Sequence, residues 1–295
     1  MKIYTTITCL LLIASLKSVA QLTTLKSSIE TLCKTKKATI GVALYDFEKG
    51  DTLSIRGDEL FPMQSVFKFH IALTILKQVE EGRLSLEKKI SISEKELLPK
   101  TWSPLRVDYP NGTELSIKEI MRYMVSQSDN NACDILLHQL GGTAVVNNYI
   151  HGLGVKDFSI QANEEEMSRA WDIQFKNWTT PKAAIIMLVW LNTSRSMSQN
   201  NNYQLLYNMM LGTTTCPNRL KKGVPANARL AHKTGTSDTN KEGITAAVND
   251  IGFVELANGK RFAISVFVSN SSENMETNEK IIADIAKLAA DYFSK

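Results

Sequence analysis

Cysteine is scarce in this sequence, and no cysteine pair is spaced as a metal or redox site requires. The 295 residues hold four cysteines without any C-x-x-C spacing. If Cys9 leaves with the leader described below, three remain, so at most one disulfide can form within the chain. The four histidines, His70, His138, His151 and His232, are scattered without ligand spacing. We therefore expect neither a bound metal nor a cofactor.

The sequence also lacks a large excess of charge of one sign, and it lacks long apolar runs. The net charge is +4, and it falls to +2 if Lys2 and Lys17 are removed with the leader. A balance this small gives no reason to expect nucleic acid or an anionic membrane as a partner. No apolar run reaches the roughly 20 residues of a membrane span. Internal repeats and low-complexity linkers are absent as well.

The first residues have the pattern of a secretory leader. Lys2 precedes a short apolar run, and Ser18 and Ala20 supply small residues at the two positions that a signal peptidase reads. We predict a signal peptide over residues 1–20, cleaved after Ala20, and hence a periplasmic or secreted protein. The remaining 275 residues suit one large domain or two interlocked ones.

Strand patterns occur near both ends of the chain. Ile40, Val42 and Leu44 alternate with smaller or polar residues before the turn EKGD, which predicts a hairpin. Three more strand candidates follow Arg229, and Asn258-Gly259 predicts a tight hairpin between the last two.

Helical periodicity dominates between these strands, from Ser65 to about Met210. Helix-start and helix-end signals support it: a capping box at Ser116 and Glu119, a stop at Gly141, and Pro181 at a first helical position after Thr180. Further helices are predicted over Thr23–Cys33 and Glu276–Phe293.

Together these patterns predict an α+β fold with an antiparallel sheet built from both chain ends. We expect a sheet domain with flanking helices over residues 21–63 and 209–295, and an inserted all-helical domain over 64–208. The helical part contains an irregular stretch at about 159–177, and a segment of that length without period is usually functional or disordered.

A lysine stands inside the most apolar helical stretch. Residues 64–77, QSVFKFHIALTILK, carry Lys68 three positions after Ser65, so both lie on one helix face. Pro62 predicts that the helix begins near Ser65, in a first turn that favours negative charge. A desolvated lysine with a lowered pKa can be the base that a serine nucleophile needs. The alternative is a helix-capping serine with a lysine that reaches solvent.

Two further stretches favour the catalytic interpretation of Ser65 and Lys68 over the capping alternative. Ser128-Asp129-Asn130 lies at the junction of two predicted helices, where a loop can present a hydroxyl and an amide together. Lys233-Thr234-Gly235 ends a predicted strand, and Gly235 leaves room for a ligand against the strand edge. Each triplet is common alone, but all three motifs in this order are not.

The motifs S-V-F-K at 65–68, S-D-N at 128–130 and K-T-G at 233–235 resemble those of the class A serine β-lactamases. HKTGTSD, SDNNACDIL and NDIGFV look most like the PER-, VEB- and CfxA-like branch, whose members are often cephalosporinases. The resemblance covers essentially the whole mature chain. It implies a β-lactamase/transpeptidase-like fold, hydrolysis of cephalosporins and penicillins, antibiotic resistance, a small-molecule substrate as the partner, and a monomer.

The resemblance also implies roles for the motif residues. Ser65 would be acylated, Lys68 would accept or relay its proton, and Ser128 with Lys233 would deliver a proton to the lactam nitrogen. Asn130 would bind the substrate's side-chain amide. The remaining expected substrate contacts are Thr234, with Lys233, for the carboxylate, the backbone N–H groups of Ser65 and Thr236 for the oxyanion, and Gly235 and Ser237 beside them.

Glu164 matches the family's deacylation base, because it stands 36 positions after Ser128 and Met167 follows it as the expected apolar residue. It would activate the water that releases the acyl group. Glu165 and Glu166 are then solvated surface charges. Whether Lys68 or Glu164 is the base for acylation stays open.

Several positions depart from the family pattern. Ser168 replaces a common asparagine, so the water would need another partner. Ala162 and Asn177 replace the Arg–Asp ion pair at the base of the irregular loop. We expect Asp134, often asparagine in the family, to hydrogen-bond to Asn177 instead.

Two outlying residues have two interpretations each. Arg219 matches an arginine that contacts the substrate carboxylate, and the alternative is plain surface charge. Trp102 matches an aromatic at the cleft mouth, and the alternative is partial core packing. Gln64 and Ser237 are not cysteines, so the disulfide of class A carbapenemases is missing and weak carbapenem hydrolysis is expected.

Two other protein classes share these motifs. A penicillin-binding D,D-peptidase hydrolyses its acyl-enzyme slowly, and Glu164 within a long loop argues against it. A β-lactam sensor is acylated without turnover, but such sensors carry membrane segments that this sequence lacks after its leader.

Overall fold

The computed structural model describes residues 21–197 and 202–295. The predicted signal peptide lies outside the described residues. A helix over 21–34 comes first. The named elements that follow are β1 (Thr39–Asp46), β2 (Thr52–Ile55), β3 (Phe61–Pro62), η1 (Gln64–Val66), α2 (Phe67–Glu80), β4 (Lys89–Ile92), η2 (Glu94–Glu96), α3 (Pro104–Asp108), β5 (Thr113–Ser116), α4 (Ile117–Ser126), α5 (Asn130–Leu140), α6 (Thr143–Gly152), β6 (Phe158–Ser159), α7 (Glu164–Met167), η3 (Trp171–Lys176), β7 (Trp178–Thr179), α8 (Pro181–Met197), α9 (Asn202–Leu211), α10 (Leu220–Gly223), β8 (Arg229–Thr236), β9 (Thr245–Glu255), β10 (Arg261–Ser271) and α11 (Met275–Phe293).

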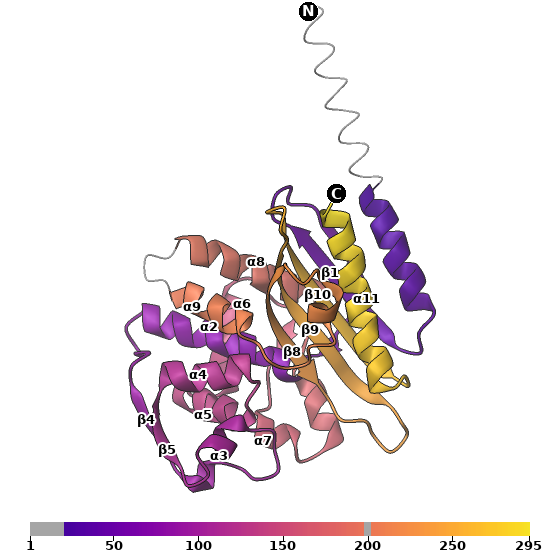
Figure 1. Ribbon diagram of the computed structural model, residues 1–295. Helices are drawn as coiled ribbons and strands as arrows, with labels where there is room; N and C mark the ends of the chain where they lie inside the picture. Colours follow the sequence, from indigo (N-terminus) through magenta and orange to yellow (C-terminus); the bar gives the residue numbers. More distant parts are fainter. Residues whose placement is uncertain (1–20, 198–201) are drawn as a thin grey trace, which may run out of the picture.

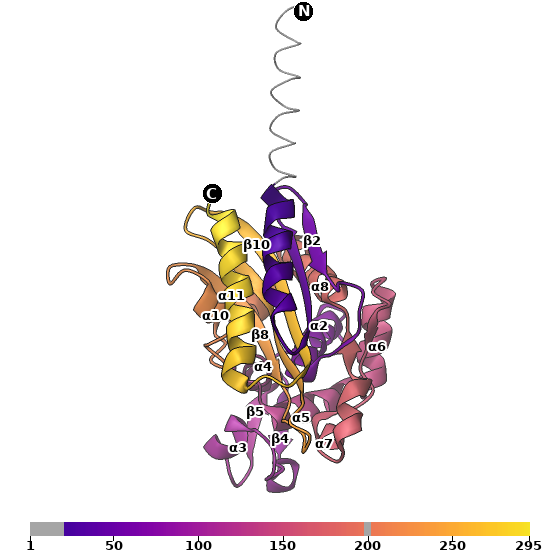
Figure 2. The ribbon, with the colours of Figure 1, turned by 90° about the vertical axis from the view of Figure 1, so that its right-hand side faces the viewer.

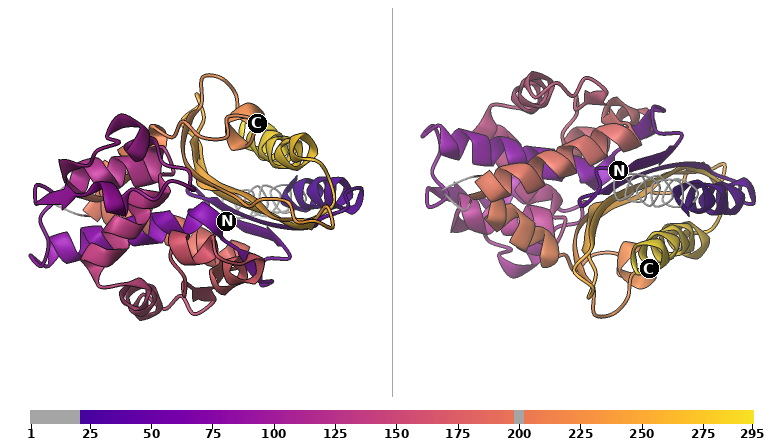
Figure 3. Two further views of the ribbon diagram at one scale, coloured as in Figure 1. Left: turned by 90° about the horizontal axis from the view of Figure 1, so that it is seen from below. Right: turned by 90° about the horizontal axis from the view of Figure 1, so that it is seen from above.

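The main sheet joins the two ends of the chain. Its strand order is β2-β1-β10-β9-β8, and all the pairings are antiparallel. The helix over 21–34 and α11 lie side by side on one face (Figures 1 and 2). Seen end-on, the sheet separates these two helices, with the short α10 packed against α11, from the helices of the middle of the chain (Figure 3). The predicted α+β fold with an antiparallel sheet is therefore confirmed.

Coverage of both sheet faces explains the composition of the inner strands. β9 and β10 read as nearly continuous buried runs because helices lie over both of their faces. β8 has β9 on one side only, so it forms an open edge of the sheet. That edge faces the helical part and carries the K-T-G motif.

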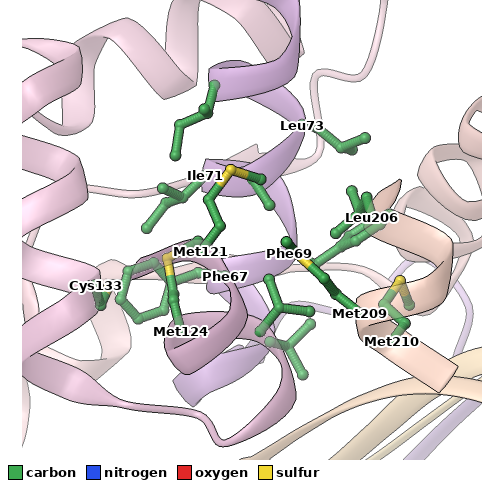
Figure 4. Close-up of a cluster of buried hydrophobic side chains, with 14 of the residues drawn as sticks. Phe67, Phe69, Ile71, Leu73, Met121, Met124, Cys133, Leu206, Met209 and Met210 are labelled. Atoms are coloured by element: carbon green, nitrogen blue, oxygen red, sulfur yellow. The ribbon is translucent and has the colours of Figure 1, made fainter. Parts of the chain in front are cut away.

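Helix α2 runs through the middle of the helical part. Its residues from Phe67 to Leu76 are all buried, so the helix has no solvent-facing side there. Figure 4 shows its apolar side chains packed against methionines of α4 and α9 and against Cys133 of α5. Lys68 therefore starts from a helix that is buried on every side, and its ammonium group needs partners inside the protein.

Local signals in the sequence predicted several boundaries correctly. Ser116 and Glu119 form a reciprocal capping box at the start of α4. Gly141 ends α5 with a positive φ of 93°. Thr180 accepts a hydrogen bond from Ala183 N at the start of α8, and Asn258-Gly259 turns between β9 and β10.

The short strands were not predicted. β4 and β5 form a separate two-stranded sheet inside the region that we predicted to be helical, and β7 and β6 of that region form a three-stranded sheet with β3, which precedes it. Strands of two to four residues are too short to show a period of two, so the helical signal around them dominates. The domain boundaries at 63/64 and 208/209 stay predictions. In the described part of the chain, no helix is long and apolar enough to cross a membrane.

Candidate active site

Ser65 lies in a tight turn that other segments hold in place. The turn is the 3-10 helix Gln64–Val66, which runs directly into α2. Just before it, Asn249 of β9 donates from Nδ2 to the carbonyls of Pro62 at 2.8 Å and Met63 at 3.1 Å. Met63 N donates to the carbonyl of Asn177 at 2.9 Å. The predicted helix start near Ser65 is thus confirmed, with a 3-10 turn ahead of the α-helix.

Gly235 allows β8 to lie directly against the turn that carries Ser65. A Cβ atom at this position would lie 2.5 Å from the carbonyl oxygen of Met63 and 3.2 Å from Val66 N. The 2.5 Å distance is shorter than real Cβ contacts, so only glycine lets β8 approach the turn this closely. Gly235 also lines a cavity next to Ser65, and the prediction that it leaves room for a ligand there stays a prediction.

Lys68 has four oxygen partners although it is fully buried. Its Nζ lies 2.9 Å from Ser65 Oγ, 2.7 Å from the carbonyl of Ser128 and 2.5 Å from Asn130 Oδ1. Glu164 Oε1 lies 2.8 Å away and forms an ion pair with it. A buried ammonium is tolerated because these contacts replace its water shell. The alternative of a lysine reaching solvent is wrong.

Ser128 presents its two oxygens to two lysines. Its backbone is in the left-handed region, with a φ of 59°. Its carbonyl accepts from Lys68, while its Oγ accepts from Lys233 Nζ at 2.8 Å. Burial, and then the positive charge of Lys68, lowers the pKa of Lys233 to about 7. A hydroxyl bonded to such a lysine can pass protons readily near neutral pH.

The end of β8 offers free hydrogen-bond donors to the cleft. Ser237 N donates to the carbonyl of Ala247, so Ser237 takes part in the ladder with β9. Residues alternate along an antiparallel strand, so the N–H group of Thr236 points away from β9, toward the open edge. Thr234 also lines the cleft, and its hydroxyl lies 2.7 Å from that of Thr215.

Glu164 begins the short helix α7. It is 9 % exposed. Asp134 of α5 accepts hydrogen bonds from the backbone N–H groups of Glu164 at 2.8 Å and Glu165 at 2.9 Å. Two carboxylate oxygens thus satisfy orphan donors at the helix start. Glu165 is exposed and ion-paired with Arg169, and Glu166 completes a capping box with Asn163.

The predicted hydrogen bond between Asp134 and Asn177 is wrong. Asn177 accepts from Gln161 N at 2.8 Å and Ala162 N at 3.0 Å, and it donates to the carbonyl of Ala162 at 2.8 Å. Each side chain therefore bonds loop backbone at a different place. Backbone groups of the loop, not the other side chain, are the nearest partners of both.

Arg219 is not a surface charge. It is 1 % exposed, donates to the carbonyls of Gly235 and Asn249, and donates from Nη2 to Thr236 Oγ1 at 2.7 Å. It also pairs with Glu279 at 3.3 Å. Its guanidinium group therefore reaches the site through the hydroxyl of Thr236.

Trp102 is 62 % exposed, so partial core packing is excluded. Its Nε1 donates to the carbonyl of Gln127 at 2.9 Å, which holds the ring at the cleft mouth. Ser237 lines the cleft, but its Oγ donates to the carbonyl of Asp238 at 2.9 Å. Ser168 donates to the carbonyl of Glu165 at 2.6 Å.

Residues of all three motifs line one continuous hollow, called the cleft below. It consists of two adjoining cavities of about 850 Å³ and 550 Å³ that share Ser65, Trp102, Asn130 and Thr236 in their walls. The larger cavity reaches the 164–174 loop, and the smaller one reaches Ser128 and the K-T-G strand. Asn130 also donates from Nδ2 to Thr101 Oγ1 at 2.6 Å. Ser65, Ser128 and Glu164 thus line one space, and the buried lysines Lys68 and Lys233 bond these residues from behind.

The family model described as the β-lactamase enzyme family matches residues 24–293. The chain belongs to the β-lactamase enzyme family. β-Lactamase VEB-1 of Pseudomonas aeruginosa is 47 % identical over 275 residues, which cover 93 % of this chain and 92 % of VEB-1. The extended-spectrum β-lactamase PER-1 of Pseudomonas aeruginosa is 40 % identical over 281 residues, 95 % of this chain and 90 % of PER-1.

Solved structures agree with these relatives. The crystal structure of TLA-1 extended-spectrum β-lactamase has a TM-score of 0.89 and 51 % identity, covering 92 % of this chain and 99 % of that one. A β-lactamase from Chitinophaga pinensis has a TM-score of 0.88 and 47 % identity, covering 91 % and 98 %. The predicted membership of the PER/VEB-like branch of class A serine β-lactamases is confirmed. The protein is a hydrolase of the β-lactam amide bond.

Some site residues of this β-lactamase were missed in the sequence. Asn249 holds the segment before the nucleophile, and Thr215 bonds the hydroxyl of Thr234. Asn249 lies within NDIGFV, where a polar pair interrupts a buried strand. A polar residue in such a strand needs an internal partner, and this was the available signal. Thr215 gave none.

Proposed function

We propose that this class A β-lactamase opens the β-lactam ring through an acyl-enzyme on Ser65 and releases the acid with a water activated by Glu164. The observation that supports the proposal most strongly is the position of Lys68. Its ammonium group lies 2.9 Å from Ser65 Oγ and 2.8 Å from Glu164 Oε1. One buried lysine thereby connects the residue that is acylated with the residue that completes the cycle.

In acylation, Ser65 Oγ bonds to the lactam carbonyl carbon and the ring C–N bond breaks. The hydroxyl proton leaves Ser65 through Lys68 or Glu164, and the lactam nitrogen receives a proton from Ser128 Oγ, which Lys233 supports at 2.8 Å. The proton taken from Ser65 is then passed to Ser128, so that Lys68, Glu164 and Ser128 return to their starting protonation states. The backbone N–H groups of Ser65 and Thr236 stabilise the oxyanion that forms between these events.

Substrate binding uses the K-T-G strand and the junction between α4 and α5. Lys233 and Thr234 hold the substrate carboxylate, and Arg219 supports this contact through the hydroxyl of Thr236. Asn130 binds the side-chain amide of the substrate. Its Nδ2 then donates to that amide in place of Thr101 Oγ1. Trp102 packs against the substrate at the mouth.

In deacylation, Glu164 takes a proton from a water as the water oxygen bonds to the ester carbonyl carbon. The bond between that carbon and Ser65 Oγ then breaks, and Ser65 regains the proton. The two hydrogen bonds from the α7 backbone to Asp134 hold the backbone of Glu164 in place. A carboxylate in this role argues against a D,D-peptidase, which hydrolyses its acyl-enzyme slowly, and against a sensor, which is acylated without turnover.

Cephalosporins and penicillins are the proposed substrates, in line with the extended-spectrum names of PER-1 and TLA-1. Weak carbapenem hydrolysis is proposed because Gln64 and Ser237 take the places of the two cysteines found in carbapenemases. The protein would act as an exported monomer, released after Ala20.

Hydrolysis of a chromogenic cephalosporin by the purified mature protein tests the proposal. The parent should turn over many equivalents, and Ser65→Gly should lose at least about a thousandfold in kcat/KM. Undiminished hydrolysis by Ser65→Gly would refute the role of Ser65.

A further inference from the structure

A pair of amide side chains joins the nucleophile turn to the loop that carries the far wall of the cleft. Gln64, directly before Ser65, donates from Nε2 to Gln174 Oε1 of η3 at 2.5 Å. Gln174 is 6 % exposed, and it donates from its own Nε2 to the carbonyl of Trp171 at 2.8 Å. That second bond fixes which end of the Gln174 amide faces Gln64.

Gln64 is held from both sides of the cleft. Its backbone is in the left-handed region, with a φ of 47°. Its Cβ lies close to Gly235, since a Cβ atom added to Gly235 would be only 3.2 Å away from it. The side chain therefore starts against β8 and ends on η3.

The pair lies on the floor of the larger cavity. Gln64, Gln174 and Trp171 all line that cavity, as do Thr236 and the end of β8. The chain of hydrogen bonds from Gln64 through Gln174 to Trp171 thus crosses from the β8 wall to the loop wall. Its length sets the separation of these walls next to the nucleophile.

From these contacts we propose that Gln64 and Gln174 form a latch that sets the width of the cleft and thereby selects β-lactams by the size of their acyl side chain. Both are positioning residues, because they act through Trp171 and the loop. The inference rests on the proposed function, since it assumes that the substrate side chain enters this cavity. The Arg–Asp ion pair of the family's loop base is replaced by Ala162 and Asn177, so the latch is a further attachment of the loop, beside those of Asn177 and Asp134.

Loss of either amide frees the loop wall at this point. A buried hydrogen-bonding group left without its partner is costly, so the segment around Trp171 moves until water reaches the remaining amide. The cleft then widens, and kcat/KM for β-lactams with bulky acyl side chains rises relative to that for compact ones.

The test is a double-mutant cycle in the mature enzyme with Gln64→Ala, Gln174→Ala and the combined variant. The readout is the kcat/KM for a cephalosporin with a bulky branched side chain divided by that for a compact penicillin. Each single variant should raise this ratio about threefold or more, and the double variant should match the singles, because one shared contact is lost. Gln161→Ala is the control, since its amide bonds Ser159 on the same loop outside the cleft.

An unchanged ratio in both singles, or effects that add, would overturn the latch. If a truncated variant does not fold, the near-isosteric Gln64→Glu replaces the donor by an acceptor and should raise the ratio equally. If the parent hydrolyses neither substrate, the proposed function fails; if active variants keep the parent's ratio, only the latch fails.

Discussion

Lys68 Nζ lies 2.8 Å from Glu164 Oε1 in a site where the two side chains are 0 % and 9 % exposed. A carboxylate and an ammonium this deeply buried depend on each other, because either one left alone would be an uncompensated charge. The same ammonium contacts Ser65 Oγ. In the proposed mechanism, acylation and deacylation are therefore electrostatically coupled through one lysine.

Lys68→Met should consequently impair both steps. Acylation should slow by at least about a thousandfold, because either route for the Ser65 proton depends on Lys68, as the acceptor itself or as the partner that positions Glu164. The protein should also unfold at a lower temperature, because Glu164 keeps a buried carboxylate without its cation. Pre-steady-state kinetics and thermal unfolding measure the two effects. Lys77→Met, on the outer part of the same helix, is the control and should change neither, whereas parent-like acylation in Lys68→Met would contradict the assignment.

Lys233 should give the enzyme an alkaline limit. Burial lowers its pKa to about 7, so the ammonium form is present below that pH and is lost above it. If this charge binds the substrate carboxylate, kcat/KM should fall above about pH 7, by up to about tenfold per pH unit, mainly through KM. Lys233→Arg keeps its charge throughout, so its pH profile should be flat there. The same alkaline limb in Lys233→Arg would exclude Lys233 as its source.

Asp134 should make stability depend on pH. Burial, and then the charge of Glu164, raises its pKa to about 7 from 3.8. The folded state therefore holds this proton more tightly than the unfolded state, and the free energy of unfolding falls as pH rises from about 4 to about 7. Asp134→Asn keeps an acceptor at the start of α7 without titrating.

Urea denaturation across that pH window measures this effect. The parent should lose stability relative to Asp134→Asn as the pH rises. Parallel curves for the two proteins would show that Asp134 has the same pKa in both states.

Gly235→Ala should displace the nucleophile turn from β8. The new Cβ would lie 2.5 Å from the carbonyl oxygen of Met63, so one of the two backbones must move. A shift of about 1 Å at Ser65 should slow acylation by about a hundredfold. Burst kinetics measure the rate, with Gly152→Ala in α6 as the control because its Cβ meets nothing within 4 Å. Normal acylation in Gly235→Ala would mean that the strand yields without moving Ser65.

The sequence predicted those features that depend on neighbouring residues. The capping box at Ser116 and the stop at Gly141 are local, and both are where the pattern puts them. The motif residues were also found, because resemblance to a family reports on spatial neighbours that spacing alone cannot. Whether Lys68 was solvated or buried followed only from the packing around α2.

The errors arose where backbone groups from distant segments meet. Asp134 and Asn177 were expected to bond each other, yet each accepts from loop N–H groups whose position no sequence pattern reports. The close approach of Gly235 to the carbonyl of Met63 was likewise not predicted. Arg219 had two sequence interpretations; its burial excludes a surface charge, and its contact with the substrate carboxylate stays a proposal.

The mass of Glu164→Gln after mixing with a cephalosporin decides whether Glu164 has the role proposed for it. Glutamine keeps the size of the side chain but cannot take a proton from water, so Ser65 should still be acylated and then remain so. Intact mass spectrometry should show a stable adduct of one opened β-lactam on the variant and none on the parent, which turns over. Release of the adduct from Glu164→Gln at the parent's rate would contradict the claim that Glu164 drives deacylation.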